Sequence, residues 1–328
     1  MSYHAAIVGC GLIGSEFSNT VTLPGVWSHA AAYAACPDTK LVAVCDQDRA
    51  KLNSCVAQWK TASPHNDLTQ MLDACQPQIV SICTPDTSHF ELVQIALKHS
   101  AVMAVLVEKP LAMNLGEAND LIELSGAYKK VLAVNYSRRY APGFQRLNKI
   151  IESGDLGEIQ LVSGLYTKGT LHNGTHWFDL ALFLFGPVSS VTAVDRLSEA
   201  EEDPTLDVVL KFGSGISAYL HACDTSAYSI FEMDIIGSRG RVRIVDSGFT
   251  IEYHQVTKSG FGAGYKKLLL HEEINGDLGE ALPVAVANLV QCLREGSSPL
   301  CSARDARQAL EVGFSAMQAA QTGQAVVL

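Results

Sequence analysis

The first strand and turn of this chain read Ala5-Ala6-Ile7-Val8-Gly9-Cys10-Gly11-Leu12-Ile13-Gly14, an apolar run that ends in the spacing G-x-G-x-x-G. The first glycine, Gly9, permits a sharp turn after a buried strand, and Gly11 removes a side chain where the backbone must approach a pyrophosphate. Gly14 lets the next helix pack closely on the strand, and the N–H groups that begin this helix face the phosphates. The motif therefore predicts a nucleotide-binding strand, turn and helix. The same spacing also occurs in glycine-rich turns that bind nothing, so the motifs around it must indicate whether this turn binds a nucleotide.

The size and charge of the chain narrow the classes of function. Its 328 residues exceed the usual size of one core, so we expect two domains, and 48% hydrophobic with 18% charged residues is typical of a globular protein. The formal net charge is -10 and the sequence has no block of Lys or Arg, so it gives no sign of a basic surface that would bind nucleic acid or anionic lipid. The longest apolar run, residues 101–107, is far shorter than the roughly 18 residues of a membrane helix. We therefore expect a small-molecule ligand, no nucleic acid and no membrane.

The cysteines and the start of the chain indicate the compartment. The nine cysteines are dispersed and form no CxxC pair, which favours reduced thiols over a disulfide framework or a zinc site. A strand that begins within the first few residues leaves no room for a secretory signal. We therefore predict a cytoplasmic protein without a bound metal.

The stretch after the glycines departs from the usual spacing. An acidic residue after the second strand accepts hydrogen bonds from the adenosine ribose and repels a 2′-phosphate, so Asp46, after the predicted strand 40–45, favours NAD over NADP. The interval from Gly14 to Asp46 is 32 residues, where about 20 is usual. This indicates an inserted loop over residues 18–27, followed by a helix with Ser28 as its N-cap. The loop either covers the cofactor or substrate, or is an inert surface excursion.

Strands and helices alternate along the next stretch of the chain. We expect helices at 67–74 and 89–99 and strands at 79–83 and 101–107. This repetition is typical of a doubly wound parallel sheet, as in a Rossmann domain.

Two of these strand ends carry polar residues. After the first, Thr84 and Pro85 would shape the edge of a cofactor cleft, and Ser88 would cap the next helix. After the second comes Glu108-Lys109-Pro110. Because ligands bind outside the carboxyl ends of parallel strands, we expect Lys109 to point into the crevice; the alternative is a solvated ion pair between Glu108 and Lys109.

The second half of the chain predicts a mainly antiparallel sheet. Alternating apolar and polar positions indicate strands at 159–166, 188–194, 207–212, 216–221, 230–236, 241–245 and 250–254, and amphipathic patterns indicate helices at 282–293 and 306–320. The parallel pattern ends near Asn135. We therefore expect an α/β Rossmann domain over residues 1–134 and an α+β domain over residues 135–328, with the last helix packing back on the first domain.

A second polar group lies in the stretch Leu171-His172-Asn173-Gly174-Thr175-His176-Trp177-Phe178-Asp179. Thr175 or Asn173 would cap a helix here, and Gly186-Pro187 would end it. His176 and Asp179 then lie at i and i+3 on one face of its first turn, where both can address one ligand. The alternative is that His176 only caps or packs at the helix start.

These motifs together resemble the glucose-fructose oxidoreductase/inositol dehydrogenase/rhizopine catabolism (Gfo/Idh/MocA) family. The residues that carry the resemblance, in the family's order and approximate spacing, are Gly9-Cys10-Gly11-Leu12-Ile13-Gly14, Val44-Cys45-Asp46, Cys83-Thr84-Pro85 with His89, Glu108-Lys109-Pro110-Leu111-Ala112, Asn135-Tyr136-Ser137-Arg138-Arg139-Tyr140, Gly154-Asp155-Leu156-Gly157-Glu158-Ile159, His176 with Asp179, and the tail Thr322-Gly323-Gln324-Ala325-Val326-Val327. The resemblance covers nearly the whole chain.

The resemblance implies hydride exchange between bound NAD(P) and a hydroxyl carbon of a sugar, cyclitol or related polyol. It makes Lys109, His176 and Asp179 the catalytic residues. A base with a pKa near the working pH removes the hydroxyl proton best, and both a desolvated lysine and a histidine suit this task. One departure concerns His172, which stands where many members carry an aspartate four residues before the catalytic histidine. It leaves the choice of base and the substrate open.

The resemblance and the positions above assign two further sets of residues. Tyr166 is included because its ring can stack on a sugar, and Arg138 because it can meet a carboxylate or phosphate; for both, the alternative is a purely structural role. The cofactor set is Gly9, Gly11, Leu12, Ile13, Gly14, Asp46, Thr84, Pro85, His89, Glu108, Lys109 and Asn135, and the substrate set is Lys109, Arg138, Tyr166, His172, Asn173, His176 and Asp179.

Three hypotheses for the function remain open. The first is an NAD-dependent dehydrogenase, with NADP the less favoured cofactor. The second is an enzyme that keeps NAD bound and cycles it, so that the net reaction is glycoside cleavage or sugar–sugar oxidoreduction. The third is a non-catalytic NAD-binding sensor, against which the presence of both Lys109 and His176 argues. For each we expect a homodimer or homotetramer through the C-terminal sheet.

Overall fold

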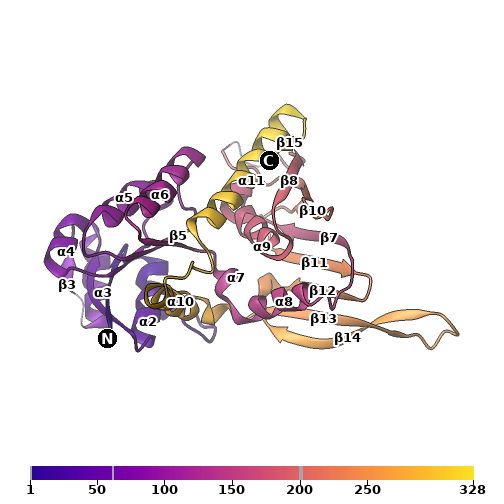
Figure 1. The fold of residues 1–328 in the computed structure, drawn as a ribbon, viewed down its shortest axis with the longest axis horizontal. Helices are drawn as coiled ribbons and strands as arrows, with labels where there is room; N and C mark the ends of the chain where they lie inside the picture. Colours follow the sequence, from indigo (N-terminus) through magenta and orange to yellow (C-terminus); the bar gives the residue numbers. More distant parts are fainter. Residues whose placement is uncertain (1, 61–62, 199–201) are drawn as a thin grey trace. The chain divides into compact units, whose positions relative to one another are not determined.

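The computed structural model describes residues 2–60, 63–198 and 202–328. The chain groups into two compact units, of which unit 1 comprises residues 1–140 and 279–307 and unit 2 comprises residues 141–278 and 308–328 (Figure 1). All nine cysteines are free thiols. No helix in the described ranges combines the length and the apolarity that crossing a bilayer requires.

Unit 1 is built on a six-stranded sheet in which neighbouring strands run parallel. The strand order is β3-β2-β1-β4-β5-β6, so the chain moves outward from β1 to β3 and then crosses to β4 on the other side of β1. The carboxyl ends of β1 and β4 flank this change of direction, which is where ligands bind in such sheets. The predicted doubly wound parallel sheet is confirmed. Its strands are β1 (Tyr3–Val8), β2 (Thr39–Cys45), β3 (Ser63–His65), β4 (Ile79–Ile82), β5 (Ala104–Glu108) and β6 (Val131–Asn135).

The helices of unit 1 follow the strands in alternation, as predicted. They are α1 (Phe17–Thr20), α2 (His29–Ala35), α3 (Arg49–Trp59), α4 (Leu68–Cys75), α5 (His89–Lys98), α6 (Leu115–Ala127), α7 (Ser137–Tyr140) and α10 (Ala281–Glu295). The predicted cap of α2 is confirmed, because the Ser28 side chain accepts a hydrogen bond from Ala31 N. The predicted cap of α5 is wrong: the Ser88 hydroxyl bonds instead to Thr84 Oγ1, at 2.8 Å, and to the Pro85 carbonyl, at 2.7 Å.

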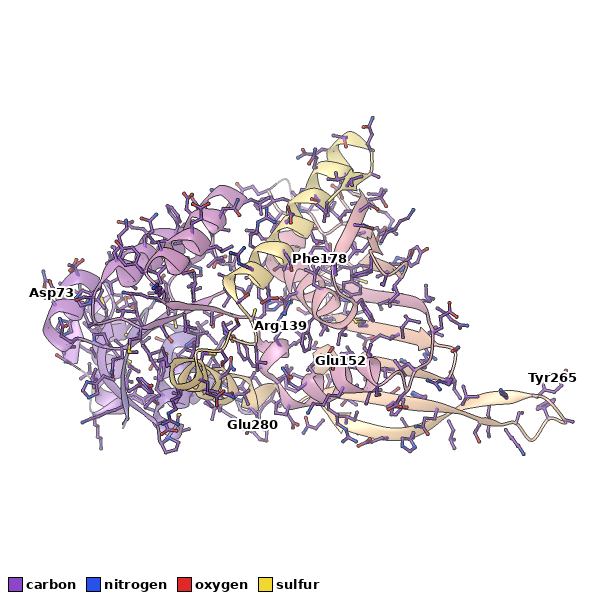
Figure 2. The ribbon with its side chains drawn as sticks, in the orientation of Figure 1. Asp73, Arg139, Glu152, Phe178, Tyr265 and Glu280 are labelled. Atoms are coloured by element: carbon purple, nitrogen blue, oxygen red, sulfur yellow. The ribbon has the colours of Figure 1, made fainter. Side chains whose placement is uncertain are left out.

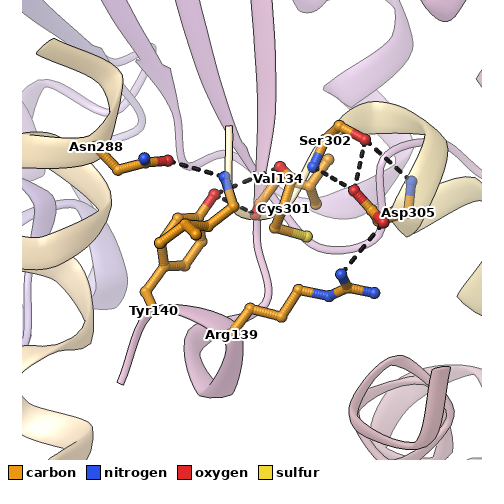
Figure 3. Close-up of polar contacts among 8 residues, drawn as sticks. Val134, Arg139, Tyr140, Asn288, Cys301, Ser302 and Asp305 are labelled. Carbon is orange, nitrogen blue, oxygen red and sulfur yellow. Dashed lines mark hydrogen bonds and ion pairs between the residues drawn. The ribbon is translucent and has the colours of Figure 1, made fainter. Parts of the chain in front are cut away.

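After unit 2 the chain returns to unit 1, where the segment around Cys301 and Ser302 lies beside β6 (Figure 3). Val134 N donates to the Cys301 carbonyl at 3.1 Å, and the Tyr140 hydroxyl lies 3.3 Å and 3.4 Å from the carbonyls of Val134 and Cys301. Arg139 pairs with Asp305 at 3.2 Å, at the start of α11 (Ala303–Thr322). These contacts use the edge of the sheet that β6 would otherwise leave open.

Unit 2 contains a nine-stranded sheet of order β14-β13-β12-β11-β7-β10-β9-β8-β15. β7 and β10 pair in parallel, and the other neighbouring strands pair antiparallel, which confirms the predicted mainly antiparallel sheet. The strands are β7 (Ile159–Tyr166), β8 (Val188–Val194), β9 (Asp207–Phe212), β10 (Ser217–Ala222), β11 (Phe231–Gly237), β12 (Gly240–Val245), β13 (Thr250–Lys258), β14 (Lys266–Asn275) and β15 (Val326–Val327). The helices α8 (Pro142–Glu152) and α9 (Thr175–Phe185) precede and follow β7.

Strand β14 was not predicted, because its sequence Lys-Lys-Leu-Leu-Leu lacks the alternation that identifies a half-buried strand. It is the edge strand of the sheet and forms a long hairpin with β13 that extends past the other strands (Figure 1). Tyr265 lies near the tip of this hairpin (Figure 2). The three leucines Leu268, Leu269 and Leu270 are all exposed, so this part of the edge strand buries no apolar side chain within the chain.

Candidate functional site

The glycine loop after β1 has the close approaches that its spacing predicts. Gly9 has φ +94°, and a Cβ at this position would lie 2.6 Å from the carbonyl carbon of Cys83. A Cβ at Gly14 would lie 2.0 Å from the Gly9 carbonyl oxygen. A Cβ at Gly11, by contrast, would meet no atom of the described residues within 4 Å. Gly9 and Gly14 are therefore required by packing, and Gly11 leaves open space beside the backbone.

The helix after this loop begins differently from the expected regular helix. Leu12–Glu16 form one wide π-type turn, η1, in which Glu16 N donates to the Gly11 carbonyl at 3.1 Å, and α1 then adds only one further turn. The Cys10 side chain is buried, with 1% exposure, so it does not cover the exposed side of the glycine loop, which is formed by backbone atoms. The first N–H groups of the turn have no intrahelical acceptor and are available to phosphate oxygens.

Asp46 lies directly after β2, beside the glycine loop. Its Oδ2 accepts a hydrogen bond from Cys10 N at 2.7 Å, and its Oδ1 accepts one from Asp48 N at 2.8 Å. A carboxylate has about four acceptor positions, so two remain for ribose hydroxyls. The structure thus brings together the glycine loop and Asp46, which the sequence placed in one cofactor site.

His89 joins the two polar loops at the ends of β4 and β5. Its Nδ1 lies 2.7 Å from the Pro110 carbonyl and its Nε2 lies 2.9 Å from the Thr84 carbonyl. The ring is fully buried. The expectation that His89 contacts the cofactor is therefore corrected: the ring holds the Thr84 and Lys109-Pro110 loops in place from within.

Glu108, beside Lys109, is held by two side chains. His29 Nε2 lies 2.8 Å from Glu108 Oε1, and Asn135 Nδ2 donates to the same oxygen at 2.6 Å. Burial by itself would raise the pKa of Glu108, but the hydrogen bond and charge of His29, the Asn135 amide and the Lys109 ammonium outweigh it and hold that pKa below its ordinary value. The carboxyl is therefore ionised at neutral pH. Lys109 itself is half-buried.

Asn135 also presents an acceptor. Its Oδ1 is buried and has no hydrogen-bond partner among the residues that the structure describes. An unsatisfied buried carbonyl oxygen is costly unless a ligand completes it. This oxygen is therefore suited to an amide N–H of a bound molecule.

The inserted stretch is exposed at residues 18–20 and 22–25, and its end is fixed within unit 1. Val26 N donates to the Gly279 carbonyl at 2.8 Å, and a Cβ at Gly25 would lie 2.5 Å from the Gly279 Cα. The end of the stretch is thus anchored next to the start of α10, shortly before α2 begins with His29. This residue was missed in the sequence because nothing local distinguishes a histidine that begins a helix.

In unit 2, the turn before α9 is held by a segment distant in sequence. Asp203 accepts hydrogen bonds from Leu171 N, at 2.7 Å, and from His172 N, at 2.9 Å. The predicted caps are wrong: Thr175 Oγ1 donates to the Leu171 carbonyl, and Asn173 Nδ2 to the Thr167 carbonyl, so neither side chain accepts from the helix start. Asp203 was not predicted because its partners lie about thirty residues earlier in the chain.

The predicted residues of α9 differ in exposure. His172 is exposed, Asn173 and His176 are half-buried, and Asp179 is 1% exposed. Their neighbour Trp177 is fully buried and donates from Nε1 to the Glu232 carbonyl at 3.1 Å, which fixes the helix against β11. Phe178 on the same helix is also buried (Figure 2).

Tyr166 is corrected from a stacking residue to a core residue. Its ring is fully buried, and its hydroxyl donates to the Leu206 carbonyl at 2.8 Å and accepts from Leu206 N at 2.8 Å. Burial is also the main cause of the raised pKa of this phenol. No face of the ring is left for a ligand. Arg138 is half-buried in α7 of unit 1.

Comparison with known proteins agrees with this architecture. Residues 3–136 match the sequence model of the Gfo/Idh/MocA oxidoreductase family, NAD-binding Rossmann fold, and residues 166–328 match that family's C-terminal alpha/beta domain. The chain is 30% identical over 209 residues to a D-glucoside 3-dehydrogenase of Escherichia coli, which covers 57% of this chain and 56% of the relative.

Two longer matches cover nearly the whole chain. A myo-inositol 2-dehydrogenase of Thermotoga maritima is 22% identical, over 98% of this chain and 97% of the relative. The structure of an oxidoreductase from Agrobacterium radiobacter, in complex with NAD+, L-tartaric acid and magnesium, has a TM-score of 0.79 at 18% identity and covers 100% of this chain and 98% of that one. The chain therefore belongs to the Gfo/Idh/MocA family of oxidoreductases, and its first part is that family's NAD-binding Rossmann fold, as the sequence predicted.

Proposed function

We propose that this protein is an NAD-dependent dehydrogenase that acts on a hydroxyl carbon of a sugar, sugar derivative or cyclitol. The observation that carries the proposal is the position of Lys109, at the carboxyl end of β5 in an NAD-binding fold, next to an ionised Glu108 and the acceptor oxygen of Asn135. D-glucoside and myo-inositol dehydrogenases are among the relatives, which supports a polyhydroxylated substrate.

The residues of unit 1 fit a dinucleotide. The open space at Gly11 and the N–H groups of η1 suit the pyrophosphate, together with Leu12 and Ile13 of that turn. Asp46 suits the adenosine ribose and disfavours a 2′-phosphate. Asn135 Oδ1 suits the carboxamide of a nicotinamide, and Thr84 and Pro85 lie at the edge formed by the end of β4. We propose NAD over NADP on this basis.

The reaction assigns separate tasks to the chain's residues. When bound, NAD accepts the hydride of the substrate carbon. The neutral amine of Lys109 takes the proton of the hydroxyl group, which requires that Lys109 can lose its own proton near the working pH. In unit 2, we assign His176 to a hydrogen bond with the substrate and Asp179, which is buried on the same helix, to orientation of the imidazole.

Residues around His176 would decide which polyol is accepted. His172 is exposed and Asn173 is half-buried, and their backbone is held by Asp203. We assign both, with Arg138, to recognition of substrate hydroxyl or acidic groups. Because the imidazole of His172 brings no negative charge to this turn, we propose a substrate with an acidic group over a neutral cyclitol.

The test is a panel of sugars, sugar acids, cyclitols and nucleotide sugars, assayed by NADH absorbance with NADP alongside. We expect at least one substrate and a fall of about 10³-fold in kcat for Lys109→Met, with unchanged NAD affinity. The matched control is Lys98→Met, on the exposed surface of α5, which should leave kcat unchanged. Unchanged turnover in Lys109→Met would refute the catalytic assignment.

Two outcomes of the same panel would favour the other hypotheses. Product formation without accumulation of free NADH would indicate a cofactor that is oxidised and re-reduced within one turnover. NAD binding by calorimetry without turnover of any compound would indicate a sensor.

We also propose a homo-oligomer that assembles through the C-terminal sheet. Leu268, Leu269 and Leu270 on the edge strand β14 are 40%, 57% and 47% exposed, and Phe261 in the hairpin is 91% exposed. Exposed apolar residues in such a row are typical of an interface. We expect a dimer or tetramer by light scattering, and dissociation in Leu269→Glu; a monomeric wild-type protein would refute it.

We propose a cytoplasmic location as well, since nine free thiols suit a reducing compartment. Fractionation of cells that express the protein tests this.

A further inference from the structure

A chain of polar side chains ends at Glu108, next to Lys109 in the sequence, and joins three elements of unit 1. Tyr33 on α2 lies 2.7 Å from Ser81 Oγ on β4, and the same Ser81 oxygen lies 2.9 Å from His29 Nδ1. His29 Nε2 then lies 2.8 Å from Glu108 Oε1 at the end of β5. Tyr33, Ser81 and His29 are fully buried.

The direction of these hydrogen bonds follows from the charge at one end. An ionised carboxylate only accepts, so the proton between His29 and Glu108 lies on His29 Nε2. In a neutral imidazole Nδ1 then accepts, so Ser81 donates to it and Tyr33 donates to Ser81. All of the donors point toward Glu108.

Packing alone does not explain why the side chains at positions 29 and 81 are polar. The neighbours of Ser81 on β4 are apolar and fully buried, and apolar side chains at positions 29 and 81 would fill the same space without the cost of burying polar atoms. The described groups that interact with Glu108 are His29, Lys109, Asn135 and Cys83. The pKa of the Cys83 thiol is raised by its burial and by Glu108, so this thiol stays neutral. The cationic or proton-donating groups that share the Glu108 charge are therefore His29, Asn135 and Lys109.

Such sharing matters for a lysine that must act as a base. A carboxylate next to an amine stabilises the ammonium form and raises the pH at which the proton is lost. The whole charge of Glu108 directed at Lys109 would stabilise the ammonium form of the lysine most strongly. A second donor on the same carboxylate reduces this effect.

We propose that His29 is a positioning residue for Lys109: it holds the Glu108 carboxylate through Nε2–H, withdraws part of its charge from the lysine, and so lets Lys109 lose its proton near the working pH. This inference rests on the proposed role of Lys109 as the base. His29 is fully buried, so in this proposal it acts through Glu108.

The proposal predicts opposite effects of two substitutions on one measured quantity. The quantity is the titration midpoint of Lys109, followed by NMR after reductive methylation with ¹³C-formaldehyde and assigned with Lys109→Arg; this needs neither NAD nor substrate. His29→Leu should raise the midpoint by about one pH unit, and Glu108→Gln should lower it by about one unit. The double variant should behave as Glu108→Gln alone, because the proposal assigns the whole effect of His29 to its hydrogen bond with Glu108.

Two further variants separate hydrogen bonding from structure. His29→Gln keeps an N–H donor and should restore the midpoint to within about 0.3 units of the wild-type value. His4→Leu, at an exposed histidine of β1, should change nothing. If His29→Leu does not fold, His29→Asn takes its place, since its shorter amide withdraws from Glu108. A midpoint that is unchanged or lowered when the donor is removed, or a double variant that differs from Glu108→Gln, overturns the proposal.

The activity readout then distinguishes the inference from the proposed function. With a substrate in hand, the acid limb of the kcat profile of His29→Leu should move upward by the same amount as the NMR midpoint, with NAD affinity unchanged. If no substrate is found but the midpoint moves as expected, the dehydrogenase proposal fails and the role of His29 stands. If activity is found and the midpoint does not move, the dehydrogenase proposal stands and the proposed role of His29 fails.

Discussion

The two units hold their proposed reactive residues by different physical means. In unit 1, Lys109 lies beside a side-chain network in which His29 and Asn135 bind Glu108. In unit 2, the turn that carries His172 and leads to His176 is held through its backbone, by Asp203, and by the buried Trp177. Substitutions in the first network should therefore change charge and proton transfer, whereas substitutions around the second should mainly change folding.

The largest effect is expected where the backbone of unit 1 has no room. Gly14→Ala should destabilise the protein by about 3 kcal/mol, because its Cβ would lie 2.0 Å from the Gly9 carbonyl oxygen. The matched control is Gly11→Ala, which meets no described atom within 4 Å and should keep the thermal midpoint while NAD affinity falls at least about tenfold. Equal losses of stability in the two variants, by calorimetry, would contradict the packing argument.

The counterpart in unit 2 is Gly164 on β7. A Cβ here would lie 2.3 Å from Trp177 Nε1 and 2.6 Å from the Glu232 carbonyl oxygen, so Gly164→Ala should cost about 2.5 kcal/mol of stability in urea unfolding. Because Trp177 adjoins His176, activity should fall together with folding. Gly213→Ala, whose Cβ would meet nothing closer than 3.8 Å, is the control. A Gly164→Ala variant that folds normally yet is inactive would contradict the expectation that substitutions in this part of unit 2 mainly change folding.

Lowering the pH should destabilise unit 1 through protonation of Glu108. The pKa of this carboxyl is lowered in the folded protein, so its contribution to stability is present above its ordinary pKa of 4.5 and is lost as the pH falls through the lower, folded value. Glu108→Gln should cost about 2 kcal/mol at pH 7, and the difference from the wild-type protein should shrink below about pH 4. Urea midpoints at several pH values test this. A constant difference down to about pH 3 would argue against an ionised, hydrogen-bonded Glu108.

The smallest effect is expected at the backbone support of unit 2. Asp203→Asn loses one of the two acceptors for Leu171 N and His172 N, so stability should fall by about 1 kcal/mol. Since the turn carries His172, the Michaelis constant should rise more than kcat falls. Asp155→Asn, at an exposed position, serves as the control. A change in kcat alone would indicate that Asp203 takes part in the chemistry.

The sequence alone was sufficient for features that depend on neighbouring residues. The glycine spacing, the run of apolar strands and the alternation in residues 159–166 each encode their structure within a short window, so the parallel sheet, strand β7 and the NAD-binding fold were all predicted. The edge strand β14 was missed because residues 266–271 are all exposed, and without a buried face a strand has no alternating pattern.

Other features were decided by contacts between distant parts of the chain. His29 meets Ser81 and Glu108 across 52 and 79 residues, and Asp203 meets Leu171 across 32. His89 and Tyr166 have residue types that suit a ligand site, yet the tertiary structure buries both rings and uses their polar atoms internally. A sequence states which polar groups are present, but only the folded chain determines which of them find partners within the protein and which remain for a ligand, because hydrogen bonding and burial depend on position in space.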